Sequence, residues 1–325
     1  MKTKLLPLGL FLSFLSLAAM SQKKQTSDKT DFMKEMIFSQ FKSIFQPDEK
    51  LMTGTKKNYT FLWDKTAKID RTLLSNSLDT LAKNLSCEKD EDKIEIKSKF
   101  PSNVQVEKDL FSIDILDYNL KNEKAETVAI ETNMNFLNFG NEFSSSFESD
   151  SSGNTVTKTK NVITINRPVT LKTKSEKISG SMTIDAKFIV GYDDIKITKS
   201  DIGKEIVFNK QKLKILSINQ GIAVVKVLEG NGKFDYLVTS SNNQPYFGGS
   251  TKTTMAQEDF DFFSGNPKFS MAEFSSYYDK NKERLLSKEL NRDIVIIKSD
   301  GEIANLYLYK ATDVLSKRIE LKIEL

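Results

Sequence analysis

Residues 212–228 read KLKILSINQGIAVVKVL, in which Asn219, Gln220 and Gly221 separate two apolar runs. Each run has the length of a strand and is rich in Ile, Val and Leu, and the polar residues between them are typical of a turn. Because apolar side chains occupy odd and even positions alike, at least one of these strands should be covered on both faces. A third strand after Gly230-Asn231-Gly232 would complete an antiparallel meander.

The period of two extends over much of the chain. Apolar residues alternate or cluster in short runs near 94–96, 113–115, 128–130, 156–169 and 182–190. These runs follow one another without the helical segments that parallel strands need as crossovers, which favours antiparallel hairpins. We therefore predict a mainly β protein with one or two antiparallel sandwich-like units, a partly helical N-terminal region and one helix near the C-terminus.

The C-terminal part continues the pattern. Strands are expected at 294–297 and 303–309, joined as a hairpin across Asp300-Gly301, and again at 319–325. Between 241 and 270 the periodicity is lost, which indicates a long irregular segment. Ser270 and Glu273 then match a capping box that opens a helix over 271–290.

Two helices are expected in the N-terminal region. Met33, Ile37, Phe41 and Ile44 recur at spacings of three and four within Asp31–Phe45. A second helix should begin after Asp70, a good N-cap residue, and a short strand should lie between them at 58–63. Isolated helices of this length are marginal in water, so we expect the first to dock on the chain's own body, with a partner or membrane surface as the alternative.

The first 21 residues have the features of a signal peptide. Lys2 and Lys4 precede an apolar stretch that is shorter than a membrane span, and small residues at Ala19 and Ser21 suit cleavage before Gln22. We therefore expect export to the periplasm, the cell surface or the medium, with no transmembrane segment after cleavage. The predicted division of the chain is 1–21 signal peptide, 22–90 mixed helical region, 91–190 antiparallel β unit, and 191–325 second β unit with an inserted loop and the helix 271–290.

Composition excludes several kinds of chemistry. The chain has no histidine and a single cysteine, Cys87, so serine or cysteine triads of the usual kind and zinc sites built from Cys and His are ruled out. Cys87 is interpreted as a small buried hydrophobic residue. No phosphate-binding or dinucleotide-binding glycine motif occurs, and no cofactor or metal is predicted. The 48 basic and 44 acidic residues nearly balance at +4, which argues against nucleic acid as a partner.

The expected function is that of an exported, non-enzymatic binding protein of the cell envelope, which acts through sheet faces or loops on another protein or a glycan. The alternative is a carbohydrate-active enzyme of the glycoside hydrolase type, since such catalysis needs only two carboxylates. The residues proposed to bind a ligand come from the segment 241–270, where aromatic side chains stand beside acidic ones: Tyr246, Phe247, Glu258, Phe260, Asp261 and Phe262.

Overall fold

The computed structural model describes residues 26–46, 51, 54–101, 109–131, 137–149, 155–286 and 293–325. The predicted signal peptide lies outside these residues, as do 287–290 at the end of the predicted C-terminal helix. The chain forms two compact units. The described residues of unit 1 fall within 26–57, 196–233 and 237–306, and those of unit 2 within 58–195, 234–236 and 307–325. The protein is mainly β, with antiparallel sheets and a few helices, which confirms the predicted fold class.

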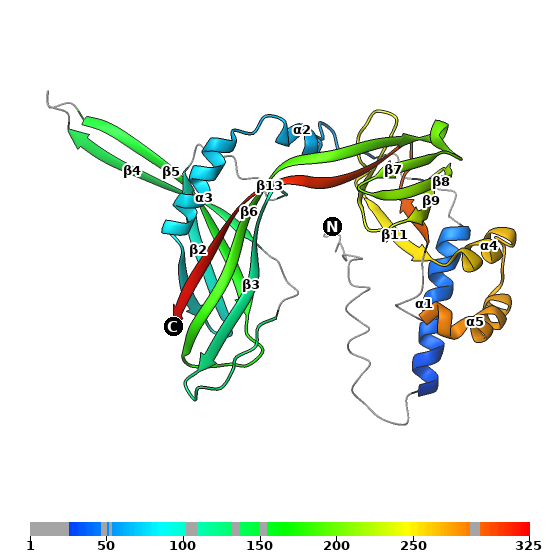
Figure 1. Cartoon of the computed structure of the whole chain (residues 1–325), viewed down its shortest axis with the longest axis horizontal. Coiled ribbons are helices and arrows are strands. Elements are labelled where there is room, and N and C mark those ends of the chain that lie inside the picture. The colour runs from blue at the N-terminus through cyan, green and yellow to red at the C-terminus, as the bar shows by residue number, and fades with distance from the viewer. Residues whose placement is uncertain are drawn as a thin grey trace, which may run out of the picture. The chain divides into compact units, whose positions relative to one another are not determined.

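Unit 2 contains a four-stranded sheet of order β1-β2-β5-β4. Its strands are β1 (Ser86–Asp90), β2 (Lys93–Pro101), β4 (Asn138–Ser149) and β5 (Thr155–Thr170). Neighbouring strands are antiparallel, with Ile94 opposite Val169 and Ile96 opposite Cys87. Figure 1 shows β4 and β5 running on together as a two-stranded ribbon.

A second sheet has the order β10-β13-β6-β3, and most of it belongs to unit 2. It is formed by β3 (Phe111–Asn122), β6 (Ile178–Thr198), β10 (Asp235–Thr239) and β13 (Asn305–Glu324). Side chains from both sheets share one apolar core, which includes Ile96 and Ile165 from the first sheet and Ile184 and Ile323 from the second. Unit 2 is therefore a sandwich-like unit whose core lies between its sheets.

Helix α3 (Arg71–Lys83) completes the core of unit 2 by burying Leu74, Leu78 and Leu81. Asp70 caps the helix as predicted, because its carboxylate accepts a hydrogen bond of 3.0 Å from the Leu73 amide. The Ser98 hydroxyl of β2 donates to the Leu81 carbonyl at 2.8 Å, so the helix is also tied to the first sheet.

Unit 1 contains a five-stranded sheet of order β11-β12-β9-β8-β7. The strands are β7 (Glu205–Phe208), β8 (Gln211–Asn219), β9 (Ile222–Glu229), β11 (Ser250–Met255) and β12 (Ile294–Ser299). A 3₁₀ turn, η3 (Lys199–Asp201), precedes β7. Val224 and Val225 of β9 are both buried although they point to opposite faces, which confirms that a central strand is covered on both sides.

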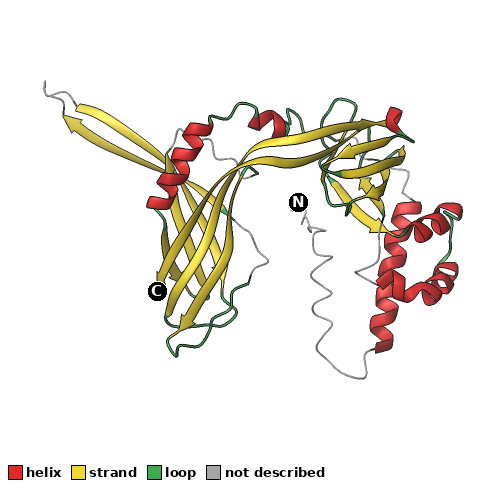
Figure 2. Ribbon diagram, viewed as in Figure 1, coloured by secondary structure: helices red, strands yellow, loops and turns green. Residues whose placement is uncertain are grey.

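Helices α1 (Thr26–Phe45), α4 (Gln257–Gly265) and α5 (Met271–Leu286) gather beside this sheet (Figure 2). Phe41 and Ile44 of α1 are buried in one core with Phe263 of α4, Phe274 of α5 and Ile296 of β12. The first helix therefore docks on the chain's own body, as expected. Among the described helices, none combines the length and apolar character needed to cross a bilayer.

Two predicted strand pairings are wrong. The chain after Gly232 does not complete a meander, because β10 pairs with β13 and not with β9. The segments 294–297 and 303–309 do not form a hairpin, because β12 pairs with β9 and β11, whereas β13 belongs to the other sheet. Gly301 between them packs closely against the Tyr246 ring, because a Cβ added at Gly301 would stand 2.2 Å from a carbon of that ring. This glycine therefore allows a close approach and does not form a hairpin turn.

The predicted strand at 58–63 is also wrong. Asn58 has a positive φ of 55°, and Phe61 is the N-cap of the short helix α2 (Leu62–Thr66). Within this segment the Phe61 ring contacts both Tyr59 and Trp63. The strand indicated near 182–190 is present and runs on through Gly191 to Thr198 as β6. A Cβ added at Gly191 would stand 3.0 Å from the Asp313 side chain.

The segment 241–270 is not irregular throughout, since it contains β11 and α4. Most of β11 consists of Ser, Thr and Lys with only Met255 buried, so it lacks an apolar alternation. Helix α4 has no local side-chain cap. Instead, the backbone amide of Gln257 donates a hydrogen bond of 3.1 Å to the carboxylate of Asp293, which lies 36 residues further along the chain. The capping box of Ser270 and Glu273 is confirmed, with the Glu273 carboxylate 2.7 Å from the Ser270 amide.

Candidate functional site

The six residues proposed from the sequence lie in two parts of unit 1. Tyr246 is buried and its hydroxyl donates to the Glu302 carbonyl at 2.7 Å, whereas the adjacent Phe247 is 67% exposed beside Gly54. The other four residues are on α4. Phe260 packs on Phe45 in the core, with ring centroids 5.9 Å apart.

Glu258, Asp261 and Phe262 share the exposed side of α4, as their spacing of three and four residues requires. Phe262 is 43% exposed and stacks on Tyr277 of α5 with ring centroids 4.1 Å apart. The structure thus brings an aromatic pair and two carboxylates together on one surface, separate from Tyr246 and Phe247 in the chain. A role for the six residues in ligand binding stays a prediction.

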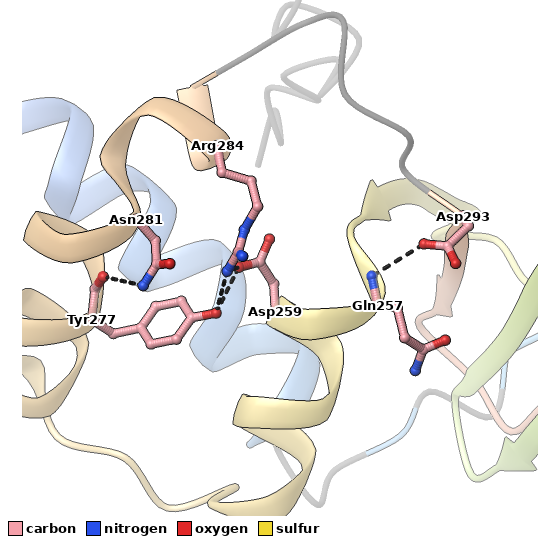
Figure 3. A network of polar contacts seen from close by, with 6 residues as sticks. All are labelled: Gln257, Asp259, Tyr277, Asn281, Arg284 and Asp293. Carbon is pink, nitrogen blue, oxygen red and sulfur yellow. Dashed lines mark hydrogen bonds and ion pairs between the residues drawn. The ribbon is translucent and has the colours of Figure 1, made fainter.

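Asp259, between these exposed residues, has a structural role (Figure 3). It is 3% exposed, and its Oδ1 accepts hydrogen bonds from Tyr277 Oη at 2.8 Å and from Arg284 Nη2 at 2.7 Å. Arg284 Nη2 also lies 2.7 Å from Tyr277 Oη, and Asn281 donates to the Tyr277 carbonyl. Burial and the bond to Asp259 raise the pKa of Tyr277. This network joins α4 to α5 through Oδ1 of the Asp259 carboxylate.

Sequence reasoning missed a second aromatic group, in unit 2, which we call the aromatic array. Its members come from the segment around α2 and from β6 and β13: Tyr59, Phe61, Trp63, Tyr192, Tyr307 and Tyr309. The rings of Phe61 and Trp63 stack within 8° of parallel, with centroids 4.7 Å apart. Trp63 also lies 5.3 Å from Tyr307 and 5.6 Å from Tyr309. All members except Tyr307 are half-buried, so the rings are held in place yet reach the surface.

Several exposed carboxylates are close to array residues in the chain. Asp64 follows Trp63 directly, and Asp193 and Asp194 follow Tyr192, all in exposed positions. Burial, followed by the neighbouring phenol and by Asp235 and Asp109, raises the pKa of Tyr192 to about 12. Burial, Asp235 and other neighbours likewise raise the pKa of Tyr309 to about 12. Burial and the charges of Asp64 and Asp193 raise the pKa of Asp194. The array therefore lies in a negative field.

The array left a partial signal in the sequence. Tyr59, Phe61 and Trp63 alternate, as do Tyr307 and Tyr309, and Trp63 is the chain's one tryptophan. Alternation shows that side chains share a face, but it does not show which distant segment they contact. The contact between these two groups of rings depends on where β13 lies in the sheet.

Other chemistry at these positions is limited. Cys87 of β1 is half-buried beside the core of unit 2, and burial raises the pKa of its thiol to about 11, which keeps it in the unreactive protonated form. Within the described ranges, no group of three or more possible ligand side chains is arranged to hold a metal ion. Comparison with family models, curated proteins and solved structures found no match for this chain.

Proposed function

We propose that the chain is an exported, non-enzymatic binding protein of the cell envelope that holds a glycan on the aromatic array. The proposal is supported by six aromatic rings from three segments that contact one another on a partly exposed surface, with carboxylates beside them in the chain. Aromatic faces pack on the apolar C–H faces of sugar rings, and phenol and carboxylate groups hydrogen-bond sugar hydroxyls.

Pre-organisation supports this proposal. The rings already contact one another, so little additional side-chain entropy is lost when a ligand packs on them. The phenols of Tyr192 and Tyr309 remain protonated up to high pH and can both donate and accept hydrogen bonds. The absence of histidine, the usual proton shuttle at neutral pH, favours binding without turnover.

A glycoside hydrolase is the second candidate, and one observation favours it. Burial and the charges of Asp64 and Asp193 raise the pKa of Asp194, which is the direction that a general acid requires. A hydrolase would cleave glycans that the chain binds, and Asp194→Asn would abolish cleavage. Binding without cleavage by the unmodified chain would exclude this second candidate.

Retention of the full chain on a panel of insoluble polysaccharides tests the main proposal. We expect Trp63→Ala to weaken retention roughly tenfold, the effect of losing one good contact. Phe262→Ala, which removes the exposed ring of α4, is the matched control and should leave retention unchanged. Circular dichroism checks that each variant folds, and Tyr59→Ala replaces Trp63→Ala if the latter does not.

Retention by none of the polysaccharides contradicts the proposal. Retention that is lost in Phe262→Ala and kept in Trp63→Ala transfers the binding site from the aromatic array to the surface of α4.

A further inference from the structure

Resting on the proposed function, we infer that the aromatic array selects basic glycans, whose sugars carry free amino groups, over neutral and acidic ones. The inference concerns a set of carboxylates that we call the acidic rim: Asp64, Asp109, Asp193, Asp194 and Asp235. All five are exposed residues of unit 2.

The acidic rim is tied to the rings by position and by charge. Asp64 follows Trp63, and Asp194, two residues beyond Tyr192 in β6, lies on the same face of the strand as that ring. Asp64 and Asp193 act electrostatically on Asp194. Asp109 and Asp235 act electrostatically on the phenols of both Tyr192 and Tyr309. The basic residues within two positions of array members in the chain are Lys57, Lys65 and Lys310, fewer than the five carboxylates of the acidic rim. Negative charge is therefore in excess around the rings.

A ligand cation would lower the energy of this arrangement in two ways. The carboxylates of Asp64, Asp193 and Asp194 repel one another, and an ammonium group between them would offset that repulsion. An ammonium group over the face of a Trp or Tyr ring is also attracted by the negative potential of that face. An acidic glycan would meet the same field with the opposite sign and be rejected.

A lysine-rich protein segment could supply ammonium groups too, but the array fits a sugar better. Three of its six members are half-exposed tyrosines, Tyr59, Tyr192 and Tyr309, whose phenols can bond several hydroxyls at once. A lysine side chain offers one ammonium and no hydroxyl, whereas an amino sugar offers both groups on a ring that packs on aromatic faces.

Isothermal titration calorimetry of the full chain at weakly acidic pH tests the inference. The four probes are a glucosamine oligomer, the N-acetylated oligomer of the same length, a galacturonic acid oligomer and oligolysine. We expect the glucosamine oligomer to bind at least tenfold more tightly than the acetylated one, and the galacturonic acid oligomer to bind least. Added salt should reduce the preference, because screening weakens exposed charges.

The double variant Asp193→Asn/Asp194→Asn should lose most of this preference. The matched control is Glu229→Gln/Glu283→Gln, which removes two exposed charges from β9 and α5 in unit 1 and should keep the preference.

The outcomes separate the two proposals. Equal binding of the glucosamine and acetylated oligomers overturns the inference and leaves the proposed function standing. Binding of no oligomer overturns both. If oligolysine binds as tightly as the glucosamine oligomer, the proposal that the ligand is a glycan is overturned, and the array is assigned to a basic protein segment.

Discussion

Asp259 and Asp261 lie two residues apart on α4 and differ in what their side chains contact. Asp259 is buried against Arg284, whereas Asp261 is exposed and accepts one bond from Gln257 at 2.7 Å. Removing one member of a buried ion pair leaves the other charge uncompensated, so Asp259→Asn should lower the local free energy of unfolding by about 3 kcal/mol. Asp261→Asn should change it by less than about 0.5 kcal/mol. Hydrogen exchange of the α4 and α5 amides measures both, and equal effects would contradict the assigned role of Asp259.

Tyr309 gives a prediction about pH at the same scale. Its folded pKa of about 12 exceeds the usual value of 10.0, so the folded unit favours the protonated phenol. The resulting contribution to stability is complete below pH 10 and is lost as the pH rises toward 12. In the phenolate absorbance titration of the folded chain, Tyr309→Phe should remove a component near pH 12. Loss of a component near pH 10 would show that burial does not protect the phenol.

Strand β13 carries the corresponding prediction for an element. Ile323 is fully buried in the core of unit 2, whereas Val314 of the same strand is 43% exposed. Ile323→Ala should destabilise unit 2 by about 3 kcal/mol, and Val314→Ala by less than about 1 kcal/mol. Urea unfolding followed by the fluorescence of Trp63, which belongs to unit 2, compares them. A small effect of Ile323→Ala would mean that the C-terminal end of β13 is not integral to the sheet.

Elements with local signals could be predicted from the sequence, and strand partners could not. Asp70 and the pair Ser270–Glu273 cap helices through residues three positions apart, so their signals lie within one turn. By contrast, Asp293 caps α4 from 36 residues away, and the choice of β13 as the partner of β10 depends on the whole sheet. The candidate site shows the same limit. The alternating aromatic residues at 59–63 and 307–309 can be seen in the sequence, but the contact between them cannot be predicted from it.

For the whole molecule, export is the premise of the proposed function. If residues 1–21 act as a signal peptide, the chain recovered from envelope fractions should begin at Gln22. Intact mass measurement with N-terminal sequencing checks the start, and Ser21→Leu, which removes a small residue from the cleavage site, should block processing. Recovery of the chain with Met1 in the cytoplasmic fraction would contradict export.

The central claim is that a glycan binds on the aromatic array. Because Trp63 is the only tryptophan, its emission reports on the array without a label. Fluorescence excited selectively at tryptophan should change saturably as a retained oligosaccharide is added, with a midpoint equal to the dissociation constant from calorimetry. Calorimetric binding of the same oligosaccharide with unchanged Trp63 emission would place the ligand elsewhere and contradict the claim.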